Sequence, residues 1–120
     1  MRVYLAGPMT NIPHFNYPAF NAAAAKLRAE GCEVFNPAEH DIATYGKDIS
    51  NPDGDADKAT ADHWFDRRAA LKADLSWICD NAEAIALLPG WERSSGARAE
   101  RALAEALGLR AILLGREVAP

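Results

Sequence analysis

The stretch Ala84–Leu107, AIALLPGWERSSGARAERALAEAL, contains the strand, turn and helix around which we expect the fold to be built. It opens with a short apolar run, Ala84–Leu88, of the length and bounded character of a buried strand. Pro89-Gly90 ends that strand. After a short loop, Ser94-Ser95-Gly96 leads into an alanine-rich helix, so the stretch predicts one strand–turn–helix unit.

Glu100 is the unusual residue of this predicted helix. Leu103 and Leu107 follow it by three and seven positions, so Glu100 shares the helix face expected to turn toward the sheet. A carboxylate that faces the interior is costly unless it is paired or used. Ligands of open α/β sheets bind at the carboxyl ends of the strands, and this places Glu100 at a candidate site.

The serines before the helix predict an anion-binding turn. Ser94 or Ser95 can act as the N-cap, since a hydroxyl accepts a hydrogen bond from a free backbone N–H of the first turn. A helix N-terminus with small residues and free N–H groups attracts anions.

Composition excludes several classes of protein. The 120 residues, 49% hydrophobic and 25% charged, suit one compact domain covering 1–120. The net charge of −4 and the lack of a basic run argue against a nucleic acid polymer as partner. No apolar run approaches the ~20 residues of a membrane span, so we expect no membrane partner. Cys32 and Cys79 have no metal or redox spacing, which favours reduced, part-buried thiols in a cytoplasmic protein.

Alternating β and α patterns follow along the chain. The fold class predicted is α/β, a three-layer flavodoxin- or Rossmann-like parallel sheet of four to five strands with helices on both faces. The expected strands are Arg2–Ala6, Glu33–Phe35, Ala84–Leu88 and Arg110–Leu114, and the expected helices are Tyr17–Glu30, a second from Thr60 or Asp62 to about Cys79, and Ser95–Leu107. The loop Met9–Asn16 holds neither a dinucleotide fingerprint nor a P-loop.

Residues 38–59 are expected to be a long loop because they show little periodicity and many turn formers. Asp53, Asp55 and Asp57 alternate as at the start of a calcium loop. Lys58 replaces the glycine that such a loop needs, and Trp64 stands where its closing glutamate belongs. We therefore expect a solvated acidic loop and no metal.

The second predicted helix carries a further inward acid. Trp64, Leu71, Leu75 and Ile78 give it an apolar face, which Asp74 borders or interrupts. Two interpretations stay open at this point. Asp74 forms an ion pair with Arg67, two turns earlier, or it belongs to a site.

The chain resembles the nucleoside 2-deoxyribosyltransferase-like superfamily, in particular its small bacterial and phage members of unassigned function, which are DUF4406-like. It is more distantly similar to the deoxynucleoside 5′-monophosphate N-glycosidases. The resemblance covers nearly all of the domain except residues 38–59. Its motifs are Val3-Tyr4-Leu5-Ala6-Gly7-Pro8, then Asp74-Leu75-x-x-Ile78, then Ser94-Ser95-Gly96-x-x-x-Glu100.

The resemblance implies cleavage or base exchange at an N-glycosidic bond of a deoxynucleotide or deoxynucleoside. Glu100 falls on the family's nucleophile, Asp74 on the acid that helps protonate the departing base, and Tyr4 on the aromatic residue near the sugar. The chemistry is consistent with these residue types. Positive charge at the anomeric carbon can be captured by a carboxylate as a covalent glycosyl-enzyme, and the base needs a proton to leave.

The resemblance also implies a substrate site and an assembly. Gly7, Pro8 and Met9 would border the base, and Trp91 would stack on it or else belong to the core. Transferases acting on free nucleosides tend to carry an acid at the position of Ser94, which favours a nucleotide whose 5′-phosphate lies at Ser94-Ser95-Gly96. The partner expected is thus a small-molecule nucleotide or nucleoside, with no cofactor, in a homodimer or higher homo-oligomer.

Two other interpretations remain open from the sequence. One is a non-catalytic nucleotide- or nucleotide-sugar-binding module on the same fold, because a fold does not determine a function. The other is a structural subunit whose inward acids are satisfied by Arg67 or by backbone groups.

Overall fold

The computed structural model describes residues 1–115, and residues 116–120 of the expected domain lie outside the described part. The described chain contains four strands and five helices. In order, the elements are β1 (Arg2–Ala6), a 3₁₀ turn (Pro13–Asn16), α1 (Tyr17–Ala29), β2 (Glu33–Phe35), α2 (Pro37–Tyr45), α3 (Ala56–His63), α4 (Arg67–Asn81), β3 (Ala84–Leu87), a 3₁₀ turn (Trp91–Arg93), α5 (Ser95–Ala106) and β4 (Arg110–Leu113).

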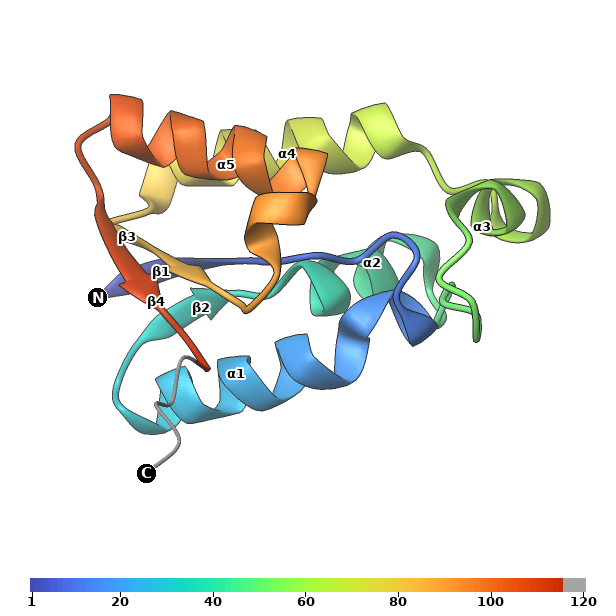
Figure 1. The fold of residues 1–120 in the computed structure, drawn as a ribbon, viewed down its shortest axis with the longest axis horizontal. Coiled ribbons are helices and arrows are strands. Elements are labelled where there is room, and N and C mark those ends of the chain that lie inside the picture. The colour runs from blue at the N-terminus through green and yellow to red at the C-terminus, as the bar shows by residue number, and fades with distance from the viewer. Residues whose placement is uncertain (116–120) are drawn as a thin grey trace.

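The strands form one parallel sheet in the order β2-β1-β3-β4. Helix α1 covers one face, and α4 and α5 cover the other, which gives three layers (Figure 1). The predicted α/β class, with its parallel sheet and helices on both faces, is confirmed. Because the chain moves outward from β1 to β2 and then to β3 on the other side, the strand order reverses between β1 and β3.

Alternation along β1 divides the core into two layers. Val3 and Leu5 pack in the cluster on the α1 side. Tyr4 and Ala6 pack in the cluster under α4 and α5, and Tyr4 is fully buried. This period of two is the one expected for a strand buried on both faces, and it aims Tyr4 at the helices that carry the candidate acids.

The expectation of a long loop over 38–59 is wrong, because helix α2 forms at its start and helix α3 at its end. Asn36 is the N-cap of α2, its side chain accepting from the Ala38 N–H at 3.0 Å, and Pro37 occupies the first helical position. Asp55 caps α3 by accepting from the Asp57 and Lys58 N–H groups. Asp55 therefore serves as a helix cap within the acidic segment.

The predicted start of the second long helix is also wrong. Thr60 lies inside α3, which ends at His63, and α4 begins at Arg67 with Asp66 as its N-cap. Trp64, expected on the apolar face of this helix, lies between the two helices in a left-handed conformation (φ 59°) and is 88% exposed.

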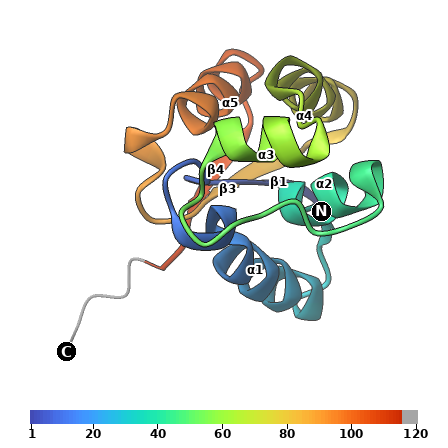
Figure 2. The ribbon, with the colours of Figure 1, turned by 90° about the vertical axis from the view of Figure 1, so that its right-hand side faces the viewer.

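The loop after β1 has an unusual backbone. Asn11, His14, Phe15 and Asn16 all have positive φ between 52° and 67°, a region that L-residues adopt at a cost. The segment before α3 supports it. The Asn11 N–H donates to the Gly54 carbonyl at 2.8 Å, and the His14 N–H to the Asn51 carbonyl at 2.8 Å. Figure 2, which looks onto the carboxyl end of β1, shows α3 lying in front of the sheet.

Two further sequence expectations can be compared with the described residues. In residues 1–115, no helix is both long and apolar enough to cross a membrane. Both cysteines are free thiols; Cys32 is half-buried as expected, but Cys79 is exposed, so the expectation of a part-buried thiol is wrong for Cys79.

Candidate active site

A cavity of about 680 Å³ opens at the carboxyl ends of the strands, where the strand order reverses. At least four parts of the chain contribute to it. The segment after β1 contributes Gly7 to Ile12, α2 contributes Asp41, α4 contributes Asp74, and the start of α5 with the turn before it contributes Ser94 to Ala97 and Glu100. Gly7 is required at the base of this crevice, since a Cβ there would lie 2.7 Å from the Cβ of Leu88.

Glu100 lies at the inner end of the cavity, on the face of α5 turned toward the sheet, and is 6% exposed. The Tyr4 hydroxyl donates a hydrogen bond of 2.7 Å to its Oε2. The Tyr4 ring stacks on Phe35 with a centroid distance of 5.4 Å, which fixes the direction of the hydroxyl. Burial and the neighbouring carboxyl groups raise the pKa of Tyr4 well above its usual value, so Tyr4 remains a donor.

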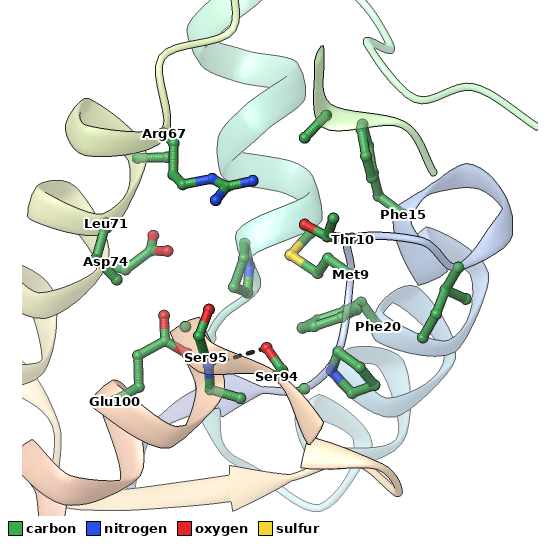
Figure 3. A pocket seen from close by; sticks show the side chains of 18 of the residues that line it. Met9, Thr10, Phe15, Phe20, Arg67, Leu71, Asp74, Ser94, Ser95 and Glu100 are labelled. Carbon is green, nitrogen blue, oxygen red and sulfur yellow. Dashed lines mark hydrogen bonds between the residues drawn. The ribbon is translucent and has the colours of Figure 1, made fainter. Parts of the chain in front are cut away.

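Asp74 projects from α4 toward the same space, and its carboxyl group faces that of Glu100 across the gap between α4 and α5 (Figure 3). The sequence left open an ion pair of Asp74 with Arg67. In the described part of the chain no ion pair joins these two residues, although Arg67 also lines the cavity. The structure thus brings Asp74 and Glu100 together without a neutralising cation between them.

Burial and mutual repulsion shape the titration of the two acids. Loss of solvation raises the pKa of Glu100 and that of Asp74 above the ordinary carboxyl range. The charge of Asp74 raises the pKa of Glu100 further, while the hydrogen bond from Tyr4 opposes the rise. Such a pair titrates as a unit, and near neutral pH it holds one proton and one negative charge.

The turn into α5 has the form predicted for the serine stretch. Ser94 is the N-cap, and its Oγ accepts from the Ala97 N–H at 3.2 Å. The N–H groups of Ser95 and Gly96 in the first turn therefore have no intrahelical acceptor. All three residues line the cavity, and a Cβ at Gly96 would meet no atom nearer than the Ser94 Oγ at 4.0 Å, so the space beside the turn is open.

The wall opposite the acids is apolar. Met9, Phe15 and Phe20 lie across the cavity from Asp74 and Glu100 (Figure 3), and Gly7 and Pro8 border its floor. Trp91 does not line the cavity. It packs against the core cluster under α4 and α5, which favours the core alternative that the sequence left open for this residue.

Among the cavity residues that sequence reasoning did not place in the site are two charged ones, Asp41 and Arg67. Asp41 on α2 is buried, and its Oδ2 accepts a 2.9 Å hydrogen bond from the Tyr17 hydroxyl. Desolvation raises its pKa to about 6, against the opposing effect of the Tyr17 hydrogen bond. Arg67 was considered only as an ion-pair partner. The signal for Asp41 was Asn36-Pro37, an N-cap followed by an N1 proline, which predicts a helix where a loop was expected.

Because the pKa of Glu100 is raised, we expect Glu100 to make the protein less stable as the pH rises. The folded state keeps the Glu100 proton above the unfolded pKa, so the free energy of unfolding falls as pH rises from the unfolded toward the folded pKa. Glu100→Gln removes this titration. We expect the variant to match the wild type below about pH 4.5 and to exceed its stability by roughly 1–3 kcal/mol at pH 8.

Urea denaturation of both proteins at a series of pH values measures this difference. Helix α5 is retained in the variant because glutamine is as good a helix former as glutamate. A difference in unfolding free energy that stays constant with pH would show that Glu100 does not hold its proton in the folded state.

Over residues 1–113 the chain matches the family model described as "Domain of unknown function (DUF4406)". No curated protein and no solved structure matches the chain. The DUF4406-like part of the expected resemblance is confirmed by this match, which carries no activity with it.

Proposed function

The chain belongs to the DUF4406 family, and from the cavity of this member we propose an N-glycosidase or deoxyribosyltransferase that acts on a deoxynucleoside 5′-monophosphate. One observation carries the proposal. Two carboxyl groups from different helices, Asp74 and Glu100, face one cavity at the carboxyl end of a parallel sheet. The resemblance of the motifs to nucleoside 2-deoxyribosyltransferases supports the same assignment.

In the proposed reaction the ionised Glu100 attacks C1′ of the deoxyribose. The C1′–N bond breaks, its electron pair goes to the base nitrogen, and Asp74 donates its proton to that nitrogen. Water then attacks C1′ of the glycosyl-enzyme and passes a proton to Asp74, while the C1′–oxygen bond to Glu100 breaks. The products are the free base and deoxyribose 5-phosphate. A second base in place of water completes a transfer instead.

Tyr4 supports the two charge states of Glu100 that this reaction needs. Its hydroxyl donates to the Glu100 carboxylate at 2.7 Å, and a hydrogen bond from a neutral donor stabilises the anion without removing its lone pairs. The other carboxyl oxygen of Glu100 is the atom proposed to attack C1′. A shared proton in the pair leaves Asp74 as the proton donor when Glu100 is ionised.

The turn Ser94-Ser95-Gly96 is the proposed phosphate subsite. Free N–H groups at the start of α5 and the positive end of its dipole favour an anion, and Arg93 lines the cavity beside them. The apolar wall of Met9 and Phe20 then faces the base, where a flat ring finds an apolar surface. A small-molecule nucleotide fits this order of subsites.

Ser94→Asp tests the phosphate subsite. Aspartate is as good an N-cap as serine, so α5 should remain intact. Its charge would repel a 5′-phosphate, and we expect kcat/KM for the nucleotide to fall at least roughly tenfold, equivalent to about 1.4 kcal/mol, with kcat/KM for the nucleoside unchanged or higher. Ser94→Asn is the neutral control, and an equal loss for nucleotide and nucleoside in Ser94→Asp would remove the phosphate assignment.

The proposed function is tested by incubating the protein with each of the four deoxynucleoside 5′-monophosphates and measuring free base by chromatography. Release of base that requires Glu100 supports the enzyme. Binding of nucleotides without turnover would instead support the alternative, a non-catalytic nucleotide-binding module. A sedimentation measurement on the same sample tests the homo-oligomer that the family resemblance supports.

A further inference from the structure

A third carboxyl group shares the cavity with the proposed catalytic pair. Asp41 projects from α2 and lines the same space as Asp74 and Glu100. Asp41 and Glu100 each accept a hydrogen bond from a different tyrosine. Tyr17 on α1 donates to Asp41 at 2.9 Å, and Tyr4 on β1 donates to Glu100 at 2.7 Å.

Asp74 interacts with both of the other acids. The negative charge of Asp41 acts on its carboxyl group, which also interacts with Glu100 and Tyr4. Glu100 in turn interacts with Asp74 and Tyr4. The cations Arg67 and Arg93 line the cavity, but no ion pair in the described chain connects either of them to Asp74. Of the three acids, Asp74 therefore lies under the negative charge of Asp41 on one side and hydrogen-bonds with Glu100 on the other.

The hydrogen bond from Tyr17 favours the negatively charged form of Asp41. A hydroxyl donor stabilises the carboxylate and opposes the desolvation that raises the pKa of Asp41 to about 6. The other groups near Tyr17 are Asp48 and Tyr45, and neither is a cation that would cancel the charge of Asp41. Above that pH Asp41 is ionised, and a proton on Asp74 relieves the repulsion between Asp74 and Asp41.

We propose that Asp41 is a positioning residue that acts through Asp74. The negative charge of Asp41, stabilised by the hydrogen bond from Tyr17, favours the protonated form of Asp74 until the base departs. This inference rests on the proposed function for its catalytic meaning. Its physical content, an electrostatic coupling between Asp41 and Asp74, stands apart from any substrate.

The decisive variant is Asp41→Asn, followed by the pH dependence of kcat/KM. Without the Asp41 charge, Asp74 loses its proton more easily, so the alkaline limb should move to lower pH by roughly one unit. Wild type and variant should have equal rates at about pH 5, where Asp41 of the wild type is protonated and as neutral as the asparagine, and differ by roughly tenfold at pH 8. Asp62→Asn, an exposed acid on α3, is the matched control and should leave the profile unchanged.

A loss that is equal at all pH values in Asp41→Asn would overturn the proposal, because it would assign Asp41 a structural role. A loss confined to certain bases would overturn it too, because Asp41 would then contact the substrate directly.

A second measurement needs no turnover. Carboxyl ¹³C NMR of aspartate-labelled protein follows the titration of Asp74, assigned by the signal that disappears in Asp74→Asn. The Asp74 midpoint should move to lower pH in Asp41→Asn and stay in place in Asp62→Asn. A moved midpoint in a protein without glycosidase activity supports the coupling and rejects the proposed function. An unmoved midpoint in an active enzyme overturns the coupling alone.

Discussion

Glu100→Gln should abolish the release of base from deoxynucleoside 5′-monophosphates, with kcat reduced by at least on the order of 10³-fold. The amide is close to the carboxylate in size and can still accept the 2.7 Å hydrogen bond from Tyr4, so the cavity should keep its shape. Only the nucleophilic charge is lost. Steady-state release of base, measured by chromatography, checks the loss.

Glu105→Gln is the matched control for this prediction. Glu105 lies on the same helix, is exposed, and forms only a 3.7 Å surface ion pair with Arg101, so its replacement should leave turnover unchanged. In the wild type, rapid acid quenching followed by mass spectrometry should show deoxyribose 5-phosphate attached to the peptide that contains Glu100. Full activity of Glu100→Gln would end the covalent mechanism.

Asp74→Asn should reduce kcat on natural nucleotides by roughly 10²–10⁴-fold, the usual contribution of a general acid. The loss should depend on the leaving base. In a 7-methylguanine nucleotide the base carries a positive charge and departs neutral without being protonated. We therefore expect kcat of the variant on this substrate to approach the wild-type value.

Comparison of the two substrates separates proton donation from other roles of Asp74. Asp80→Asn, an exposed acid on the same helix, provides the control and should behave as the wild type on both. If Asp74→Asn loses as much activity with the methylated base as with the natural one, Asp74 binds or orients the substrate and is not its acid.

The acids and the turn were predictable because local patterns determine them. The spacing of Glu100 to Leu103 placed the carboxylate on the buried face of α5, and the structure finds it 6% exposed. The serine turn predicted an N-cap, and Ser94 fills that role. Alternation along β1 likewise determined the side to which Tyr4 points.

The prediction of secondary structure failed in residues 38–59, where polar cap residues and turn formers flank two short helices. Asn36-Pro37 and Asp55 carry the N-terminal signals of α2 and α3, but both helices are too short for their apolar period to stand out. The cavity wall at Asp41 was lost with them. Its charge partner Asp74 is 33 positions away in the chain, and no local pattern reports such a contact.

Aromatic residues were the other source of error. Trp64 fits a helical apolar stripe by spacing, but the chain changes direction at this residue, so the stripe is broken and the ring is exposed. Trp91 stands close to the site in the sequence, yet the 3₁₀ turn Trp91–Arg93 directs it to the core cluster. The spacing of apolar residues predicts the buried face of a helix only over the residues that the helix includes.

The left-handed backbone of the loop at Asn11 to Asn16 has a consequence for how this fold can diversify. The loop contributes Phe15 to the apolar wall of the cavity, and its backbone is held through Asn51 and Gly54 rather than through α4 or α5, which carry Asp74 and Glu100. Exchanging the segment around Asn51 would therefore change the shape of this part of the cavity and leave Asp74 and Glu100 in place. Related proteins that share Asp74 and Glu100 could in this way recognise different molecules.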